Sequence, residues 1–311
     1  MLNEIKIGHY TNFSAGTGCT VIVPPTNNIA SACVRGASPG TRELALLAPD
    51  KKVSRIDALV LTGGSAFGLG CAHGVMETLA DRNIGYQTKF GVVPIVPAAV
   101  IFDKNIGDPK AYPTAEDAIQ ACKEIRSNND NMGNIGAGTG ATIGKYMGME
   151  SAMKAGIGIS SLEHDGIRVT VLTVVNAVGD VIGFDGNIMA GAIDPSGNFY
   201  AQNDSLSRWQ TSQLGMSANT VLSAVMINAK ITKQQAFFLA ERAHYGIARR
   251  IDPSHTSFDG DVTFVVSVPE VEVNIDLVSS MMVKSVEESI IKSVKYSKSL
   301  FGIKSYQDIT K

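Results

Sequence analysis

The step from Asn219 to Thr220 is the position at which the sequence most clearly offers chemistry. A polar segment, residues 201–218, precedes it, and an apolar run, residues 220–227, follows it. A hydroxyl residue that begins a rigid strand can attack the preceding carbonyl, and water then hydrolyses the resulting ester to leave threonine with a free α-amine. That amine, with a pKa near ~8, can accept the hydroxyl proton at neutral pH. The alternative is that Thr220 is an ordinary β-branched strand residue.

A second pattern is the run Asp259-Gly260-Asp261. Residues two apart on a strand face the same side, so both carboxylates could reach one nucleophile. The alternative is a turn or a solvated hairpin tip, where this composition is common.

Two further patterns do not match the chemistry that they superficially suggest. Residues 138–145 resemble a phosphate-binding loop, but the glycine spacing is wrong and Tyr146 stands where Ser or Thr is required. The histidines lack the spacing of a zinc site, and the cysteines lie far apart. We therefore expect no ATP, no other cofactor and no metal. The histidines are His9, His73, His164, His244 and His255, and the cysteines are Cys19, Cys33, Cys71 and Cys122.

Composition favours a globular protein in a reducing compartment. The 311 residues are 44% hydrophobic, enough for a substantial core, and 27 basic against 29 acidic residues give a net charge of −2. Nucleic acid is not an expected partner, because no basic stripe stands out. The first six residues lack the features of a secretion signal, and no apolar run is long enough to span a bilayer. We expect a cytoplasmic protein with buried thiols and no membrane association.

Hydrophobic periodicity predicts a framework of sheet with helices. Strands are expected at residues 57–61, 92–96, 168–175, 220–227 and 262–268. Helices are expected at 114–125, from Thr232 to near Pro253, and at 275–300, with Thr232 and Gln235 at capping-box spacing. Glycine clusters at 62–68 and 136–140 let backbone approach closely. Without an internal repeat or a linker, residues 1–311 read as one domain.

Several short stretches, taken together, resemble one known family. They are residues 36–43, 61–69, 93–97, 136–141, 219–220 and 255–261. From His9 onward the sequence is similar to the L-aminopeptidase/D-Ala-esterase (DmpA-like) family, which includes β-aminopeptidases and nylon-oligomer hydrolases. The resemblance implies a four-layer αββα sandwich, an α/β fold of Ntn-hydrolase architecture with DmpA-like connectivity. It also implies self-cleavage into an α-chain, 1–219, and a β-chain, 220–311, and a homo-oligomer of αβ units, often a tetramer of heterodimers.

The resemblance also implies roles for individual residues. Thr220 takes the place of the family's nucleophile, and Asp259 and Asp261 match the pair that orients and activates it in the nylon-hydrolase branch. Lys145 matches a lysine near the nucleophile, and Asn176 matches the amide that donates to the oxyanion. From the residues alone, a surface lysine and a strand-end turn residue are the alternatives for these two.

One departure from the family pattern concerns the substrate. Where some members carry a tyrosine that helps at the oxyanion, this sequence has Phe102, which cannot donate a hydrogen bond. Asp103 is the only nearby carboxylate that could bind the free amine of a substrate. Both residues are therefore predicted to contact substrate.

The expected activity is hydrolysis of an amide or ester bond in a small amino-acid or peptide derivative, through an acyl-Thr220 intermediate. One alternative is an acyltransferase like ornithine acetyltransferase, which shares this architecture. Another is an unprocessed binding protein on the same scaffold. The sequence leaves the natural substrate open among α-peptides, β-peptides, D-amino-acid esters and other amides.

Overall fold

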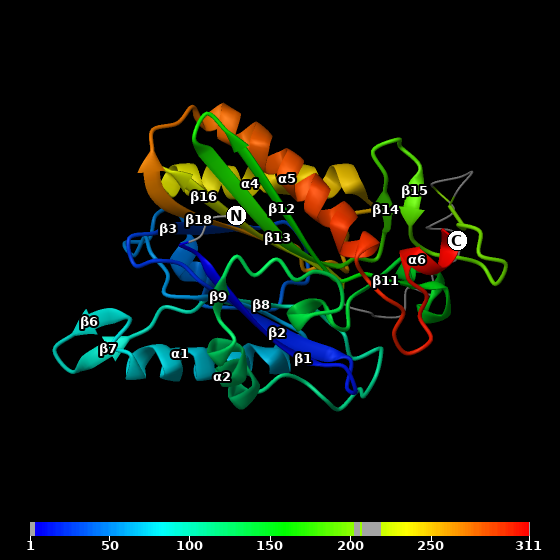
Figure 1. Cartoon of the computed structure of the whole chain (residues 1–311), viewed down its shortest axis with the longest axis horizontal. Helices are drawn as coiled ribbons and strands as arrows, with labels where there is room; N and C mark the ends of the chain where they lie inside the picture. Colours follow the sequence, from blue (N-terminus) through cyan, green and yellow to red (C-terminus); the bar gives the residue numbers. More distant parts are fainter. Residues whose placement is uncertain (1–3, 202–205, 207–218, 311) are drawn as a thin grey trace.

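Two β-sheets face each other, and helices cover the outer side of each. The computed structural model describes residues 4–201, 206 and 219–310. In Figure 1 the helices α4 and α5 lie above one sheet, and α1 and α2 lie below the other. The order helix, sheet, sheet, helix confirms the predicted four-layer sandwich.

The first sheet has the order β4-β8-β5-β2-β1-β9. Helices α1, Cys71–Asp81, and α2, Ala115–Lys123, cover it with a compact apolar cluster that includes buried alanine, valine and cysteine side chains. Its strands are β1 Lys6–Asn12, β2 Thr17–Val23, β4 Thr41–Arg42, β5 Leu59–Thr62, β8 Ala98–Val100 and β9 Arg126–Ser127.

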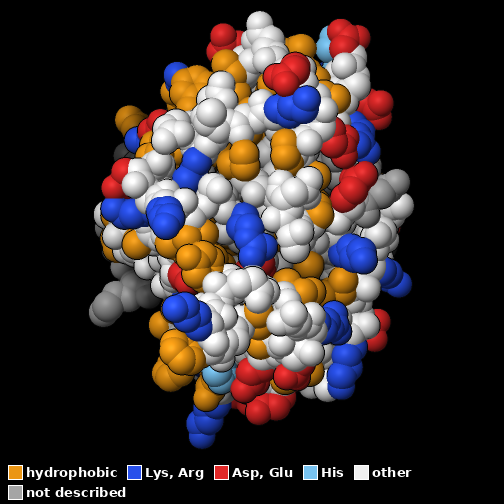
Figure 2. All heavy atoms as spheres, turned by 90° about the vertical axis from the view of Figure 1, so that its left-hand side faces the viewer, with side chains coloured by type: hydrophobic (Ala, Val, Ile, Leu, Met, Phe, Trp, Pro, Cys, Tyr) orange, Lys and Arg blue, Asp and Glu red, His pale blue; other side chains and the backbone are white. Residues whose placement is uncertain are grey.

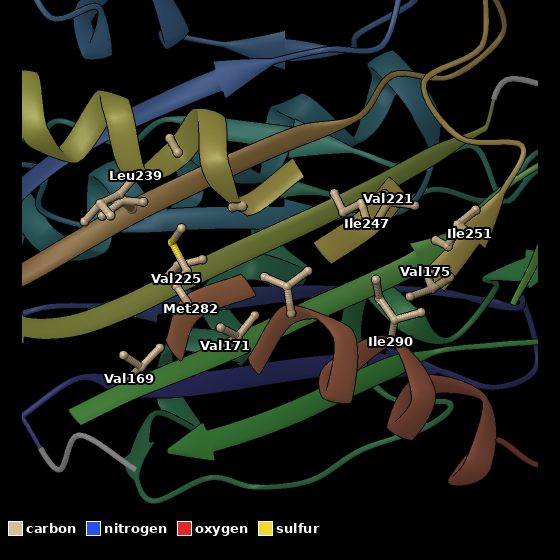
Figure 3. Packing of buried hydrophobic residues seen from close by; sticks show 14 of the residues in the cluster. Val169, Val171, Val175, Val221, Val225, Leu239, Ile247, Ile251, Met282 and Ile290 are labelled. Atoms are coloured by element: carbon tan, nitrogen blue, oxygen red, sulfur yellow. The ribbon is translucent and has the colours of Figure 1, made fainter. Parts of the chain in front are cut away.

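The second sheet has the order β12-β13-β16-β18-β3 and carries the central strands of the molecule. The pair β16 and β18 is parallel, and the other neighbours are antiparallel. Helices α4, Lys233–Arg250, and α5, Ile275–Lys295, pack on its outer face, as Figure 3 shows for the buried side chains between them. The strands are β3 Ile29–Val34, β12 Ile157–His164, β13 Ile167–Asn176, β16 Thr220–Ala229 and β18 Val262–Val271.

Smaller elements complete the described chain. The strand β10 pairs with β11, the hairpin of β6 and β7 projects from the left side in Figure 1, and β14 lies between β15 and β17. Their bounds are β6 Tyr86–Thr88, β7 Gly91–Val93, β10 Thr142–Ile143, β11 Met153–Lys154, β14 Asp180–Ile182, β15 Ile188–Ala190, β17 Ile251–Asp252 and α6 Tyr306–Ile309.

Alternation along β16 fixes which way its side chains point. Val221 and Val225 belong to the cluster under α4 and α5, whereas Leu222 and Met226 belong to the cluster between the two sheets. Because successive side chains of a strand point to opposite faces, Thr220 lies on the same side as Leu222. The first residue of β16 thus faces the layer between the sheets.

Four of the five predicted strands are confirmed to within a few residues at their ends, and the strand at 92–96 is wrong. Residues 91–93 form one arm of the exposed hairpin, and the buried strand of this region is β8 at 98–100. Pro94 explains the difference, since it cannot donate to a ladder in the middle of the predicted segment.

The predicted helices are present, with one shorter than expected. Thr232 and Gln235 form the predicted capping box of α4, and Thr114 with Asp117 forms that of α2. Helix α5 ends at Lys295 rather than 300, because Asn134 bonds both the N–H and the carbonyl of Lys298 and holds that backbone out of the helix. Helix α1 was not predicted, since no capping residue marks its start.

The polar segment at 201–218 lies outside the described residues, apart from Ala201 and Leu206.

Figure 2 shows basic, acidic and apolar side chains intermixed over one face of the molecule. All four cysteines are buried free thiols, as predicted. Within the described ranges, no helix combines the length and the apolar composition needed to cross a bilayer.

Gly158 tests how closely α5 must approach the sheet. A Cβ at this position of β12 would lie 1.8 Å from the carbonyl oxygen of Ser289 in α5. We expect Gly158→Ala to lower the free energy of unfolding by about 2 kcal/mol or more in urea titrations, because backbone must move. The control Gly70→Ala, where a Cβ would meet nothing within 4 Å and φ is −59°, should be neutral or stabilising. Equal stability of both variants would contradict the tight packing.

Candidate active site

Thr220 is buried where β16 begins, at the end of the layer between the sheets. Only 4% of its surface is exposed, and the preceding Asn219 is 1% exposed. Asn219 forms an isolated parallel bridge with Asp259, and its N–H donates to the carbonyl of Phe258 at 3.1 Å. The peptide bond between Asn219 and Thr220 is therefore held on both sides by backbone.

The carbonyl of Asn219 has two close polar neighbours. The N–H of Gly260 donates to its oxygen at 2.7 Å, and the hydroxyl Oγ1 of Thr220 lies 2.5 Å from the same oxygen. A Cβ at position 260 would lie 3.0 Å from Oγ1 of Thr220 and 2.7 Å from the carbonyl oxygen of Ser38. Glycine is thus the residue that lets this N–H lie against the carbonyl.

The two aspartates predicted to serve the nucleophile are both at the site, but their partners differ. Asp261 accepts the N–H of Val221 at 2.7 Å, and its other oxygen accepts from the backbone N–H and Nδ1 of His255. Asp259 accepts the N–H and hydroxyl of Thr256 on its Oδ2, and no donor among the described residues reaches its Oδ1. Both carboxylates are 1% exposed.

Asn176 lies directly across from Thr220 on the neighbouring strand, since the two are paired in the register of β13 and β16. Its Oδ1 accepts from the N–H of Thr142 at 3.1 Å and from Lys145 at 3.0 Å, and its Nδ2 donates to the carbonyl of Phe102 at 3.0 Å. The sheet register therefore brings this amide to Thr220, with one of its two N–H groups already bonded.

Lys145 is buried rather than at the surface. Its Nζ donates to both the backbone carbonyl and the Oδ1 of Asn176, each at 3.0 Å. Burial lowers the pKa of Lys145 to about 7, and Asp259 partly offsets this effect. Burial also raises the pKa of Asp259 to about 6, aided by the charge of Asp261 and opposed by Lys145. The site thus contains two groups that titrate near neutral pH.

Phe102 and Asp103 follow β8 on the opposite sheet. The carbonyl of Phe102 contacts Asn176, as described above. The carboxylate of Asp103 is 2% exposed and accepts from the hydroxyl of Thr17 at 2.6 Å and the N–H of Gly64 at 2.7 Å. Their predicted contacts with substrate stay a prediction.

Sequence reasoning missed two contributors to this site. The N–H of Gly260 is a backbone group, and the residue type does not reveal where a backbone N–H points. Lys154 is fully buried and donates to the carbonyls of Ala141 and Ala155. Its apolar and small neighbours in the sequence were the available signal for burial.

A cleft of about 1000 Å³ lies beside these segments. Thr220 is not among the residues that line it, but residues 104–107, which follow Asp103, and 149–152, which follow the segment of Lys145, are. Acidic and basic side chains face the same cleft, namely Lys104, Glu150, Asp194 and Lys304. Among the described residues, no three His, Cys, Asp or Glu side chains are grouped so that they could hold a metal ion.

A comparison of the sequence with models of known protein families identifies the family of this chain. The model of peptidase family S58 matches residues 2–307. The chain belongs to peptidase family S58. The predicted resemblance and the prediction of a hydrolase are confirmed by this match.

Relatives within the S58 family include an uncharacterized aminopeptidase from Mycobacterium bovis. It is 36% identical over 286 residues, which cover 86% of this chain and 80% of the relative. A 6-aminohexanoate-oligomer endohydrolase from Kocuria sp. is 26% identical over 273 residues, covering 86% and 74%. The chain is also similar to the solved L-aminopeptidase D-Ala-esterase/amidase of Ochrobactrum anthropi, a variant of the Ntn hydrolase fold. The TM-score is 0.72 at 18% identity, over 94% of this chain and 84% of that one. This likeness confirms the predicted fold of the S58 chain.

Asp261 offers a test of what holds the site together. Its two oxygens accept three N–H groups, so Asp261→Asn would leave at least one of those donors facing an NH₂ group. We expect a loss of about 1–3 kcal/mol in the free energy of unfolding, measured by urea titration. The control is Asp165→Asn, since the Asp165 side chain is 83% exposed, and it should change stability by less than ~0.5 kcal/mol. An unchanged Asp261→Asn protein would show that the carboxylate is not a structural acceptor.

Proposed function

We propose that this S58 peptidase is a self-cleaving N-terminal-nucleophile amidohydrolase, with Thr220 as the nucleophile. The observation that carries the proposal is the carbonyl of Asn219, which lies against both the N–H of Gly260 and the hydroxyl of Thr220. An N–H already aimed at that oxygen can stabilise the negative charge that develops when the hydroxyl attacks the carbonyl carbon.

In the intact chain the amine of Thr220 is tied up in the peptide bond, so another group must accept the hydroxyl proton. Asp259 is the proposed base, because its Oδ1 lacks a donor among the described residues and its pKa is raised to about 6. The bond from Oγ1 to the carbonyl carbon forms, the bond from carbon to nitrogen breaks, and the nitrogen takes up the proton. Water then hydrolyses the ester, which leaves Asn219 with a carboxylate and Thr220 with a free amine.

Lys145 is proposed to act in its protonated form. An ammonium has three N–H donors, and two of them go to Asn176. The third exists only while Lys145 is charged, and we assign it to the hydroxyl of Thr220. The same charge favours the ionised form of Asp259.

After cleavage, the same residues are proposed to turn over an external amide or ester. Thr220 attacks the substrate carbonyl, its own α-amine or Asp259 accepts the proton, and the second N–H of Asn176 contributes to the oxyanion. Water releases the acyl group. The α-chain 1–219 and β-chain 220–311 stay packed, because β16 pairs with β13 and β18 pairs with β3 across the two chains.

The names of the relatives indicate the substrate class. Aminopeptidase, D-Ala-esterase/amidase and oligomer endohydrolase activities all break an amide or ester bond in a small amino-acid derivative. We propose the same class here, with Asp103 and Phe102 as candidate substrate contacts. We also propose a homo-oligomer of αβ units.

Mass spectrometry under denaturing conditions tests the assignment of Thr220. We expect the wild type to give two fragments divided after residue 219, and Thr220→Ala to give one intact chain of 32.9 kDa. Hydrolysis of amino-acid p-nitroanilides should fall by at least ~10³-fold in Thr220→Ala. Thr220→Ser retains a hydroxyl and should still cleave.

Three results would point elsewhere. A cut at another bond, or full activity of Thr220→Ala, would exclude this nucleophile. An intact wild-type chain that never acylates would favour a binding protein. Acyl transfer to an amine, without release of free acid in water, would favour an acyltransferase.

The pH dependence of self-cleavage tests the roles of Asp259 and Lys145. Below pH about 6 Asp259 is protonated and cannot accept a proton, and above pH about 7 Lys145 loses its third donor. The rate of self-cleavage of a freshly translated precursor should therefore fall about tenfold per pH unit below pH about 6, the acid limb, and above pH about 7, the alkaline limb. In Lys145→Met we expect a rate lower by about 10²-fold or more, no alkaline limb, and an acid limb shifted to higher pH. A Lys145→Met profile that keeps the alkaline limb would assign that limb to another group.

A further inference from the structure

Lys154 is a buried cation that the proposed chemistry does not use. It is 0% exposed, and its Nζ donates to the carbonyl of Ala141 at 2.5 Å and to that of Ala155 at 2.9 Å. Both of these partners are uncharged backbone carbonyls. Burying an ammonium without a bonded carboxylate is expensive, so the position calls for a physical explanation.

Asp103 is the buried carboxylate on the other side of the same segment. A Cβ at Gly140 would lie 2.5 Å from Cβ of Asp103 and 2.9 Å from its Oδ2. A Cβ at Gly63 would lie 2.0 Å from that oxygen. Glycine at both places allows backbone from two loops to close around the carboxylate.

Three consecutive residues connect these charges to the active site. Gly140 packs on Asp103, and the carbonyl of Ala141 accepts a hydrogen bond from Lys154. The N–H of Thr142 donates to the Oδ1 of Asn176. The same Oδ1 accepts from Lys145. Thr142 is moreover the cross-strand partner of Lys154 in the pair of β10 and β11. The two lysines therefore lie on either side of one short strand.

We propose that Lys154 and Asp103 are positioning residues that set the charge of Lys145, with opposite signs, across the segment 140–142. This proposal rests on the proposed function of Lys145. The like charge of Lys154 disfavours an ammonium at Lys145, and the opposite charge of Asp103 favours it. In support, Lys154 lowers and Asp103 raises the pKa of Lys145. Burial lowers the pKa of Lys154 itself to about 7, so its charge acts on Lys145 below that pH.

Other charged groups also surround Lys145. Asp259 raises its pKa from the side of β18, and Asp261, next to Asp259, is bonded to His255. From the side of β14, Asp180 accepts from the hydroxyl of Tyr146, the residue after Lys145. The contacts described here for these groups do not involve Lys154 or Asp103.

The test is the alkaline limb of self-cleavage in freshly translated precursor, where no free α-amine contributes. In Lys154→Met the cation is lost and an unbranched side chain of similar length remains, so Lys145 should keep its proton to higher pH. We expect this limb to move up by at least about half a pH unit. Adding Asp103→Asn, which keeps an acceptor for the N–H of Gly64, should move the limb down again relative to Lys154→Met alone.

Lys233 supplies a matched control. Its Nζ is also held by backbone carbonyls, those of Leu46, Lys51 and Val53, but it has no charge interaction with Lys145. Lys233→Met should leave both limbs in place. Circular dichroism and urea unfolding at one fixed pH would show that each variant is folded.

The outcomes separate this inference from the proposed function. If the wild type does not cleave after residue 219, the proposed function fails. If the wild type cleaves with the expected profile but folded Lys154→Met does not move the alkaline limb, the inference is overturned. The same holds if both substitutions move the limb in one direction, because a general loosening of the site would do that.

Discussion

Charges held between two apolar sheets are the constraint on which this structure depends. Lys145, Lys154, Asp103 and Asp259 are each at most 4% exposed, and the layer between the sheets is filled mainly by aliphatic side chains. A buried charge is tolerated only when hydrogen bonds and opposite charges replace its water. The backbone around the site supplies those bonds, and the opposite charges of Asp259 and Asp103 act on Lys145. As a result the pKa values of Lys145 and Lys154 fall to about 7 and that of Asp259 rises to about 6, where protons can be moved near neutral pH.

The need to bring backbone up to these groups explains the glycine clusters. A Cβ at Gly63 or Gly140 would overlap Asp103, and one at Gly36 would lie 2.3 Å from the backbone of both Asp259 and Asp261. The N–H groups of Arg35 and Gly36 donate to the carbonyl of Asp261. The small residues of the sequence motifs thus serve close approach, and the reactive side chains stand at the points of contact.

Much of the fold could be predicted from the sequence, and the partners of the site residues could not. Alternation and capping residues placed β13, β16, β18 and α4, because local patterns determine those elements. Helix α1 lacks such a signal. The pairing of Asn176 with Thr220 depends on sheet register. The charge interaction between Asp259 and Lys145 depends on segments that are far apart in the sequence. The burial of Lys154 is likewise a tertiary property, since its partners are carbonyls that any residue would supply.

The two aspartates show why a motif does not define a role. Both come from one Asp-Gly-Asp run and both are buried, yet Asp261 uses its two oxygens to hold Val221 and His255. Among the described residues, Asp259 accepts donors on Oδ2 alone, both from Thr256. Its pKa is raised to about 6, which suits a group that accepts a proton near neutral pH. Hydrogen bonding thus distinguishes the two carboxylates: Asp261 holds the start of β16, whereas proton exchange is the role that we propose for Asp259.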